Sequence, residues 1–262
     1  MKVEVLLSTM NQSNIDIYEQ MNIETDAIII NQSNFNGYNK KNINNKKIEM
    51  YSFDEKGVGK SRNAALSRST SEICLIADDD MIFFNDYEKT IIQAFHDNPK
   101  ADVIIFNLVA ENINGNLSCK VKNSGKVHFY NYLRYGTANI AFKRKKIVKE
   151  NIFFSLLFGG GAKYGSGEDT LFLTECLKKG LNVYTHETLI AKIKYRPSTW
   201  FEGYNEKYFY DKGALFTAIN KKTVYIKILL FIFKHKKMFK EYNYFQMFLW
   251  MLRGVNDFKR LE

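Results

Sequence analysis

Short apolar runs rich in β-branched residues recur through the first half of the chain, and they constrain its fold more than any other feature. Each run is bounded by polar or Asn/Asp-rich turns, which is the pattern of a buried strand. The runs are residues 3–7, 27–31, 47–52, 73–77 and 102–109. Helical patterns fall between them at 60–70 and 86–97, the second with Asn85 or Asp86 as its expected N-cap. This alternation predicts an α/β fold with a mostly parallel sheet covered on both sides.

The remaining segments are less regular. Residues 31–47 hold seven Asn and four Lys without an apolar period, so we expect a surface excursion between two strands. The NGN and NSG turns predict a hairpin at about 117–129. A helix is expected at 168–179, closed by Gly180, and residues 206–253 have a helical pattern almost throughout.

The composition excludes several classes of protein. With 45% apolar and 25% charged residues, the chain is globular and not disordered. Three separated cysteines without a CxxC pair argue against a disulfide scaffold or a cysteine zinc site and favour a reducing compartment. We expect no secretory leader and no membrane span, because the longest apolar run, Ile228–Phe233, is far shorter than the ~20 residues that a span needs. No nucleic-acid partner is expected either, since no recognition helix, zinc site or RNA-binding signature is found.

Three consecutive carboxylates follow the fourth apolar run, in the sequence ICLIADDD. Open α/β sheets bind their ligands at this carboxyl edge of the strands. In an extended segment Asp78 and Asp80 share one face, so both can address one hard divalent cation, Mg²⁺ or Mn²⁺, while Asp79 points away. A solvated acidic turn is the other interpretation that these three residues allow by themselves.

The segment GVGKSRNAAL, eighteen residues upstream, resembles the end of a phosphate-binding loop. In that interpretation the chain is a nucleotide-binding hydrolase that uses Lys60, Ser61 and Asp78. The first glycine of the motif would have to stand at position 54, which is Asp54, and a carboxylate there would repel phosphate. We therefore rank the hydrolase second. A Gly-rich turn that leads into a helix bearing Arg62 remains a suitable place for an anionic group.

A glycine-rich loop at 158–167 delivers two carboxylates, Glu168 and Asp169, to the start of a helix. Acidic residues in a first helical turn are ordinarily partners of the helix dipole. Five glycines within nine positions indicate more than that, namely a segment that closes over a substrate with one carboxylate as general base.

Several segments stand in an order that is itself informative. They are LLSTMNQ, IIINQSN, GVGKSRNAAL, IADDDMIF as a DxD motif, GTANIAFKR as an acceptor-side segment, and GEDTLF as a Glu-Asp motif. Together they resemble the family 2 inverting glycosyltransferases of the GT-A fold, of the kind that builds bacterial surface polysaccharides such as capsule and lipopolysaccharide. The resemblance covers roughly residues 1–200. It implies a GT-A domain at 1–205, followed by a helical extension at 206–262.

The resemblance also implies a role for individual residues. The donor, a nucleotide-diphosphate sugar such as a UDP-hexose, would be bound by Ser8, Thr9, Asn31, Gln32, Arg62, Asp78 and Asp79. Asp80 and Asp78 would hold the Mn²⁺ or Mg²⁺ ion, and Asp169, with Glu168 beside it, would be the catalytic base. Some relatives carry a metal-binding His where this chain reads KIKYRPSTW, so coordination would rest on Asp80, the diphosphate and water. The QxxRW motif of processive relatives is missing, which favours a non-processive transfer to a saccharide or lipid-linked acceptor.

The last segment is strongly basic. Residues 221–262 contain ten Lys/Arg and three Asp/Glu, so they carry +7 of the net charge of +10. Aromatic and apolar residues alternate with these lysines. Two interpretations stay open: the helices pack on the body of the protein, or they lie on an anionic leaflet through lysines together with Phe231, Phe233 and Trp250. The second predicts a cytoplasmic protein held peripherally at the inner face of the membrane.

Overall fold

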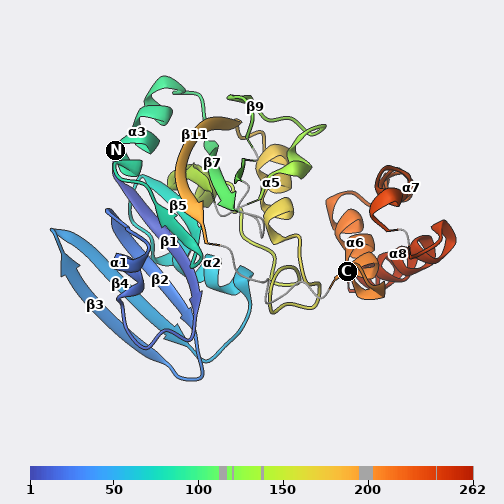
Figure 1. Cartoon of the computed structure of the whole chain (residues 1–262), viewed down its shortest axis with the longest axis horizontal. Helices are drawn as coiled ribbons and strands as arrows, with labels where there is room; N and C mark the ends of the chain where they lie inside the picture. Colours follow the sequence, from blue (N-terminus) through green and yellow to red (C-terminus); the bar gives the residue numbers. More distant parts are fainter. Residues whose placement is uncertain (112–116, 120, 137–138, 195–202, 240, 262) are drawn as a thin grey trace.

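A single mixed sheet forms the centre of the computed structural model, which describes residues 1–111, 117–119, 121–136, 139–194, 203–239 and 241–261 (Figure 1). The main strand order in this part of the chain is β3-β4-β2-β1-β5-β10-β7-β11-β6, with β8 paired to β7 and β9 to β11. The strands are β1 (Val3–Met10), β2 (Asp26–Gln32), β3 (Gly37–Ile43), β4 (Lys46–Phe53), β5 (Ile73–Asp78), β6 (Met81–Phe83), β7 (Val103–Glu111), β8 (Leu117–Cys119), β9 (Gly125–Lys126), β10 (Ile140–Lys143) and β11 (Val183–Ile193).

The predicted strands and their direction are confirmed. Each of the five apolar runs is a strand, and β4, β2, β1 and β5 run parallel, as do β7 and β11. The sheet is mixed because β10 lies antiparallel between β5 and β7, and because the edge strands β3 and β6 are antiparallel to their neighbours. The apolar runs are buried on both faces, which explains their almost unbroken hydrophobicity.

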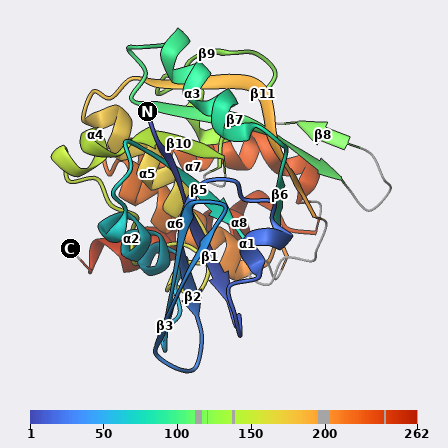
Figure 2. The ribbon, with the colours of Figure 1, turned by 90° about the vertical axis from the view of Figure 1, so that its left-hand side faces the viewer.

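Helices cover the two faces of the sheet (Figure 2). On one face α1 and α3 contribute to a core with Tyr18, Ile91 and Phe95, and on the other α2, α4 and α5 contribute Leu66 and Phe172. The helices are α1 (Ile17–Gln20), α2 (Val58–Arg68), α3 (Tyr87–Asp97), α4 (Arg144–Lys149), α5 (Glu168–Lys178), α6 (Glu206–Ile219), α7 (Val224–His235) and α8 (Tyr244–Lys259), with short 3₁₀ helices at Tyr132–Arg134 and Lys236–Met238. The helices expected at 60–70, 86–97 and 168–179 are therefore confirmed.

The N-cap expected at α3 is confirmed as Asp86, but this residue caps the helix without its side chain. Asp86 is in the left-handed region (φ 61°), and its side chain makes no capping hydrogen bond. That carboxylate pairs with Lys89 instead, at 2.7 Å.

One expectation about the loops is incomplete and one is wrong. Residues 31–47 do lie largely at the surface between two strands, but they are not only a loop, because β3 and β4 pair from Gly37–Ser52 to Ile43–Lys46 as a hairpin at the edge of the sheet. Asn44 and Asn45 form its turn with φ of 50° and 62°, a conformation that Asn tolerates well in two-residue hairpins. The hairpin predicted at 117–129 does not form, since β8 pairs with β7 and β9 with β11; residues 114–116, the NGN turn, lie outside the described residues.

The C-terminal helices α6, α7 and α8, which we call the helical unit, gather at one end of the long axis of the molecule (Figure 1). They have a third core of their own, built largely from aromatic and aliphatic side chains. At the crossing of α6 and α8, a Cβ at Gly213 would overlap the carbonyl oxygen of Met251. Gly254 is equally restricted by the carbonyl of Tyr210, so both positions require glycine.

Two of the three aromatic residues expected to lie on a membrane pack instead against other rings of the helical unit. Phe231 packs against Phe239 with ring centroids 5.9 Å apart, and Trp250 stacks on Phe209 at 5.8 Å. Phe233 alone of the three is largely exposed, at 66%. No helix within the described ranges combines the length and the apolar character that crossing a bilayer requires.

Candidate active site

Polar side chains end three neighbouring parallel strands at one edge of the sheet. In the register of the sheet, Ser8 of β1 lies beside Asp78 of β5, and Met10 lies beside Gln32 of β2. The residues just before this edge are apolar in all three strands (5–7, 27–30 and 73–77), so the first polar residues beyond them come together at the same edge. This convergence is the reason why residues separated by up to seventy positions meet in one site.

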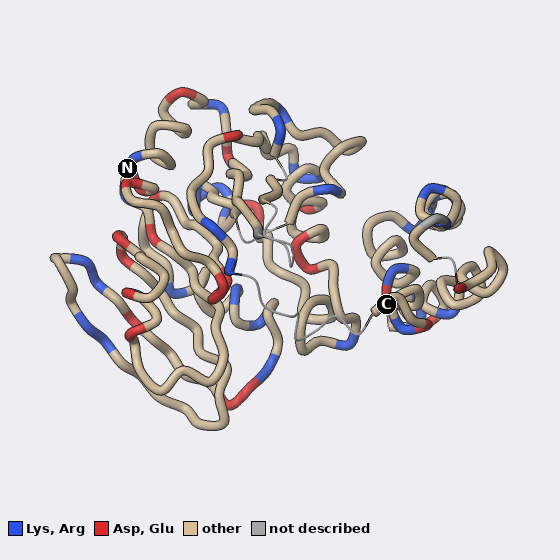
Figure 3. The backbone as a smooth tube through the Cα atoms, in the orientation of Figure 1, with Lys and Arg blue, Asp and Glu red and all other residues tan. Residues whose placement is uncertain are grey.

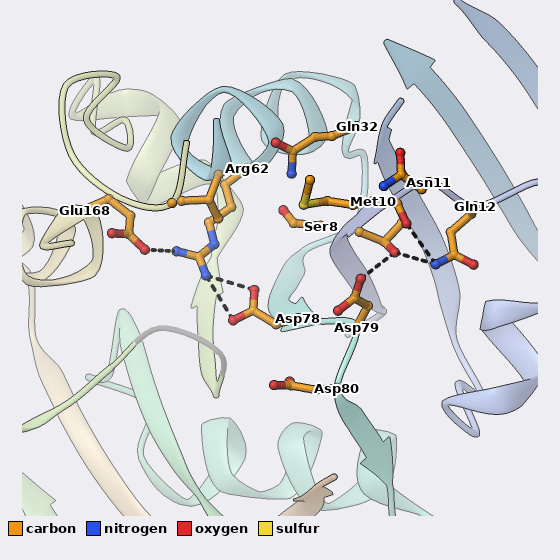
Figure 4. A pocket seen from close by; sticks show the side chains of 13 residues that line it. Ser8, Met10, Asn11, Gln12, Gln32, Arg62, Asp78, Asp79, Asp80 and Glu168 are labelled. Atoms are coloured by element: carbon orange, nitrogen blue, oxygen red, sulfur yellow. Dashed lines mark hydrogen bonds and ion pairs between the residues drawn. The ribbon is translucent and has the colours of Figure 1, made fainter. Parts of the chain in front are cut away.

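A cleft of about 580 Å³ opens at this edge. Eight of the predicted donor-side or catalytic residues line it, namely Ser8, Thr9, Gln32, Arg62, Asp78, Asp79, Asp80 and Glu168 (Figure 4). Asn31 and Asp169 do not line it. The cleft therefore collects the DxD segment, the strand ends and the start of α5, and it leaves the expected base just outside its wall.

Arg62 is the buried charge at the centre of the cleft wall. Its side chain is only 3% exposed, and its Nη2 donates to both oxygens of Asp78 at 2.9 and 3.2 Å. Its Nη1 donates to Glu168 Oε1 at 2.9 Å (Figure 4), and its guanidinium lies 5.4 Å from the centre of the Phe154 ring. Burial by itself lowers the pKa of Arg62, but the charges of Asp78 and Glu168 outweigh it and raise that pKa, so the guanidinium stays charged.

Glu168 is held from two sides at the beginning of α5. Besides the Arg62 contact, its Oε2 accepts from the backbone N–H of Gly167 at 3.2 Å. Burial raises the pKa of Glu168, with a further upward contribution from Asp169, against the lowering effect of Arg62. A carboxylate tied to a buried guanidinium in this way joins α5 to α2 across the cleft.

Asp169 occupies a different place from Glu168. It is half-buried, and its Oδ1 accepts from the N–H of Thr170 at 2.6 Å. A Cβ on Gly136 would lie 3.5 Å from Asp169 Oδ2, so this carboxylate faces the start of the expected acceptor-side segment 136–144. Residues 137–138 of that segment, and 195–200 of the KIKYRPSTW segment, lie outside the described residues.

The expectation that Asp79 points away from Asp78 and Asp80 is wrong. The alternation assumed an extended chain, but β5 ends at Asp78 and the next two residues form a turn. All three carboxylates therefore line the same cleft. Asp79 Oδ2 accepts from Thr9 Oγ1 at 2.7 Å, and Thr9 in turn accepts from Gln12 Nε2 at 3.0 Å.

Asn31 and Gln32 hold backbone segments of the site in place through their side-chain hydrogen bonds. Asn31 is fully buried, where it exchanges hydrogen bonds with the backbone of Gln12 and donates to Ser52 Oγ, each at 2.9 Å. Gln32 Oε1 accepts from the N–H of Gly57 at 2.7 Å and so fixes the turn that starts α2. Asn31 thus holds the loop after β1, and Gln32 holds the helix that carries Arg62.

The carboxylates fit a hard cation only together with other ligands. No group of three His, Cys, Asp or Glu side chains in the described part of the chain is arranged to hold a metal ion by itself. Asp78 and Asp80 are nevertheless oxygen donors on the same cleft. Mg²⁺ is commonly bound by one or two carboxylates plus phosphates and water, so these residues fit an ion that arrives with a diphosphate.

The phosphate-loop alternative is not supported by the geometry. Lys60 is exposed, forms an ion pair with Glu55 at 3.6 Å and does not line the cleft. Ser61 is buried and donates to Ser8 Oγ at 2.8 Å, so its hydroxyl joins α2 to β1. Neither side chain takes the place that the hydrolase interpretation requires.

Sequence reasoning missed several residues of the cleft. Met10, Asn11, Gln12, Val58 and Gly160 also line it. Asn11 and Gln12 could have been found, because they directly follow the end of the first strand on the ligand-binding edge. Gly160 belongs to the glycine-rich loop that was expected near the substrate, but the sequence does not single out this residue, since only the folded path of the loop brings it to Val58.

Comparisons with known proteins agree with this arrangement. The sequence model of glycosyl transferase family 2 matches residues 27–157, which is half of the chain. The fold is similar to that of S. aureus TarS residues 1–349 in complex with UDP-GlcNAc, with a TM-score of 0.60 and 17% identity over 83% of this chain and 66% of that one. The complex of the same TarS fragment with UDP gives a TM-score of 0.60 with 16% identity, over 83% of this chain and 65% of that one.

This chain therefore spans slightly less than two thirds of each of those solved chains. Among curated proteins, no sequence matches. The likeness to TarS shows the GT-A fold, and the family match covers the sheet strands from β2 to β10, including Arg62 and the three consecutive aspartates. The chain belongs to glycosyl transferase family 2.

Proposed function

We propose that this chain transfers a sugar from a nucleoside-diphosphate donor, a UDP-hexose, to a hydroxyl group of a saccharide or lipid-linked acceptor. The observation that carries this proposal is the cleft at the ends of β1 and β5, where Asp78, Asp79 and Asp80 lie beside the buried Arg62. Carboxylates accept hydrogen bonds from the hydroxyl groups of a sugar or ribose, and together with a bound cation they can face a diphosphate. Family membership supports the donor class, and the UDP-GlcNAc complex of a protein with the same fold supports the nucleotide.

The reaction that we propose is a single displacement with inversion. A carboxylate takes the proton of the acceptor hydroxyl while that oxygen forms a bond to the anomeric carbon. The bond from this carbon to the diphosphate breaks, and its electron pair leaves with the nucleoside diphosphate. Asp169 suits the role of base better than Glu168, because Glu168 is already bound to Arg62 while Asp169 faces the acceptor-side segment at Gly136.

We assign the cation site to Asp80 and Asp78, with Mn²⁺ or Mg²⁺ as the ion. When bound, such an ion neutralises the charge that develops on the diphosphate leaving group. Ser8, Thr9, Gln32 and Asp79 line the same cleft and are assigned to donor binding. Asn31 supports that site from the buried layer beneath it. The missing QxxRW motif supports one transfer per encounter.

A panel of UDP-, GDP- and dTDP-sugars with Mn²⁺, read as release of the nucleoside diphosphate, tests this proposal. Release from at least one UDP-sugar, stimulated by a saccharide acceptor, is the expected result. ATP serves as the control, because a phosphate-loop hydrolase would release phosphate from it. Turnover of ATP without turnover of any nucleotide sugar would overturn the proposal.

We also propose that the helical unit holds the protein peripherally on the cytoplasmic side of an anionic membrane. Several large apolar side chains of α7 and α8 are exposed, and exposed apolar side chains that lie near one another are typical of an interaction surface. They are Ile226, Leu229, Leu230, Phe233 and Phe245. Lysines lie on the same helices (Figure 3), and the excess of +7 over 221–262 opposes contact with a second, equally basic copy and favours an anionic surface.

Vesicle co-sedimentation distinguishes lipid from protein as the partner. The intact chain is expected to pellet with anionic vesicles and to be released by salt, because each lysine near such a surface contributes only about 1 kcal/mol. The variant Phe233→Glu should lose this binding. Phe153→Glu is the matched control, since Phe153 is 54% exposed and lies outside the helical unit. Equal binding to neutral vesicles, or concentration-dependent dimers instead of vesicle binding, would overturn the membrane proposal.

A further inference from the structure

The glycine-rich loop 158–167 lies between the cleft and the helical unit. On the cleft side, the carbonyl of Gly160 accepts from the N–H of Val58, the first residue of α2, at 2.9 Å. Gly161 passes so near that a Cβ there would lie 3.0 Å from the nitrogen of Gly57. The loop therefore rests on the start of the helix that carries Arg62, and Gly160 itself lines the cleft.

On its other side the loop is built into the helical unit. Phe158 and Tyr164 are fully buried members of the aromatic core formed with α6, α7 and α8. The hydroxyl of Tyr164 donates to Asp257 Oδ2 on α8 at 2.7 Å, and Lys163 pairs with the same carboxylate at 2.6 Å. These contacts fix the middle of the loop on the helices rather than on the sheet.

The last turn of the loop is fixed by α6. The N–H of Gly165 donates to Asp211 Oδ2 at 2.8 Å, and the carboxylate of Asp211 is itself buried, at 7% exposure. Gly167 has φ 122°, which favours glycine at this position, and a Cβ there would lie 2.7 Å from Leu215 Cδ1 of α6. The very next residue is Glu168, so α6 determines where α5 begins.

The charges around Asp211 agree with a positioning role. Lys207 pairs with Asp211 one turn earlier on α6, at 2.8 Å. Lys212 is largely buried, and burial lowers its pKa, while Asp169, Asp211 and Glu168 act against that shift. A positive charge from the helical unit thus interacts electrostatically with both carboxylates at the start of α5. A buried carboxylate such as Asp211 is costly unless it is hydrogen-bonded, and one of its partners is an amide of the loop.

We propose that Asp211 is a positioning residue for sugar transfer, which acts through Gly165 and Gly167 to place Glu168 and Asp169. The helical unit is then part of the active site and not an appendage to it. This inference rests on the proposed function, since it gives those two carboxylates their task. Displacing a catalytic group by about 1 Å can cost ~10²-fold in rate, so a single hydrogen bond that fixes the loop is enough to matter.

Three variants test the proposal kinetically. Asp211→Ala removes the acceptor of the Gly165 N–H, and we expect kcat to fall at least ~10-fold while KM for the donor changes less than ~3-fold. Asp211→Asn keeps an oxygen that accepts the same bond and should recover most of kcat. Glu206→Ala, the matched control, removes an exposed carboxylate of α6 that pairs with Arg253 and not with the loop, so kcat should stay within ~2-fold.

Hydrogen exchange provides a readout that does not depend on activity. In Asp211→Ala, amides of 158–169 should exchange faster, while those of the buried strand β1 stay unchanged. Full kcat in Asp211→Ala, equal losses in Asp211→Ala and Asp211→Asn, or equal losses in the Glu206→Ala control would each overturn the inference. If the wild-type chain turned over no nucleotide sugar, the proposed function would be wrong. Hydrogen exchange would then test the positioning role separately, and unchanged exchange rates of the loop amides in Asp211→Ala would overturn it.

Discussion

The sheet edge and the helical unit each contain a buried charged residue, Arg62 and Asp211, but the two residues have different surroundings. At the sheet edge Arg62 binds Asp78 and Glu168, and this cluster faces an open cleft. In the helical unit the buried Asp211 and the half-buried Asp257 accept hydrogen bonds from groups of the glycine-rich loop, so their charge is directed at the chain itself. The difference agrees with the proposed division of roles, in which the sheet edge binds the substrate and the helices fix the loop next to the cleft.

Removing Asp80, the carboxylate proposed to bind the metal ion, should have the largest effect on turnover. Asp80→Ala is expected to abolish transfer, and chelation should do so reversibly in the wild type. Thermal stability should be unchanged or improved, because a half-exposed carboxylate near two others is removed. Asp97→Ala, at an exposed helix end, is the control. Undiminished turnover in fully chelated enzyme would contradict the metal requirement proposed for Asp80.

Replacing the proposed base should have the next largest effect. Asp169→Asn is expected to lower kcat ~10²-fold or more, with donor affinity nearly unchanged, because a general base acts only in the chemical step. Glu168→Gln should instead weaken donor binding, since it removes one of the two charges that hold Arg62. Steady-state kinetics together with donor titration separates the two. Normal turnover in Asp169→Asn would move the role of base elsewhere.

The helical unit contains its own contrast between a buried and an exposed aromatic residue. Phe209 is fully buried, so Phe209→Ala should cost about 3–5 kcal/mol of unfolding free energy. Phe233 is 66% exposed, and Phe233→Ala should change stability by less than about 0.5 kcal/mol. Urea denaturation of both variants measures this difference. A large loss in Phe233→Ala would mean that its face is covered within the folded chain.

Acid should reveal the smallest of these effects, at the contact between Asp257 and the loop. Hydrogen bonds from Lys163, Tyr210 and Tyr164 lower the pKa of Asp257 from its usual 3.8 to about 2. A carboxyl group whose pKa is lower in the folded state stabilises that state above its unfolded pKa, and the contribution is lost as the pH falls towards 2. Asp257→Asn should thus lower Tm at pH 6, and its difference from wild type should vanish near pH 2. A difference that does not depend on pH would contradict the assignment.

The sequence predicts more of the structure of the sheet edge than of the helical unit. Strands β1, β2 and β5 are predicted correctly, because a short, mainly apolar run rich in β-branched residues and bounded by polar residues is most stable in the interior of a sheet. The same logic locates Asp78 and Gln32 at one edge. The orientation of Asp79 is not predictable by alternation, because the chain turns immediately after Asp78.

In the helical unit the helices themselves are predictable, but their faces are not. Residues 228–233 of α7 are an unbroken apolar run, so periodicity does not distinguish Phe231, which packs inward, from Phe233, which is exposed. The role of Asp211 also has no sequence signal, because it depends on a loop amide 46 positions away. Contacts of this kind follow from the tertiary arrangement alone.

Calorimetric titration of the cleft tests the central claim most directly. With Mn²⁺ present, UDP or a UDP-sugar should bind the wild-type chain at one site, and ATP should bind more weakly. Asp79→Ala should lower that affinity at least ~10-fold, since hydrogen bonds to charged groups are worth about 1.5–3 kcal/mol. Asp97→Ala should leave it unchanged. Tighter binding of ATP than of every nucleotide sugar, or an unaltered affinity in Asp79→Ala, would contradict the assignment of this cleft to a nucleotide-sugar donor.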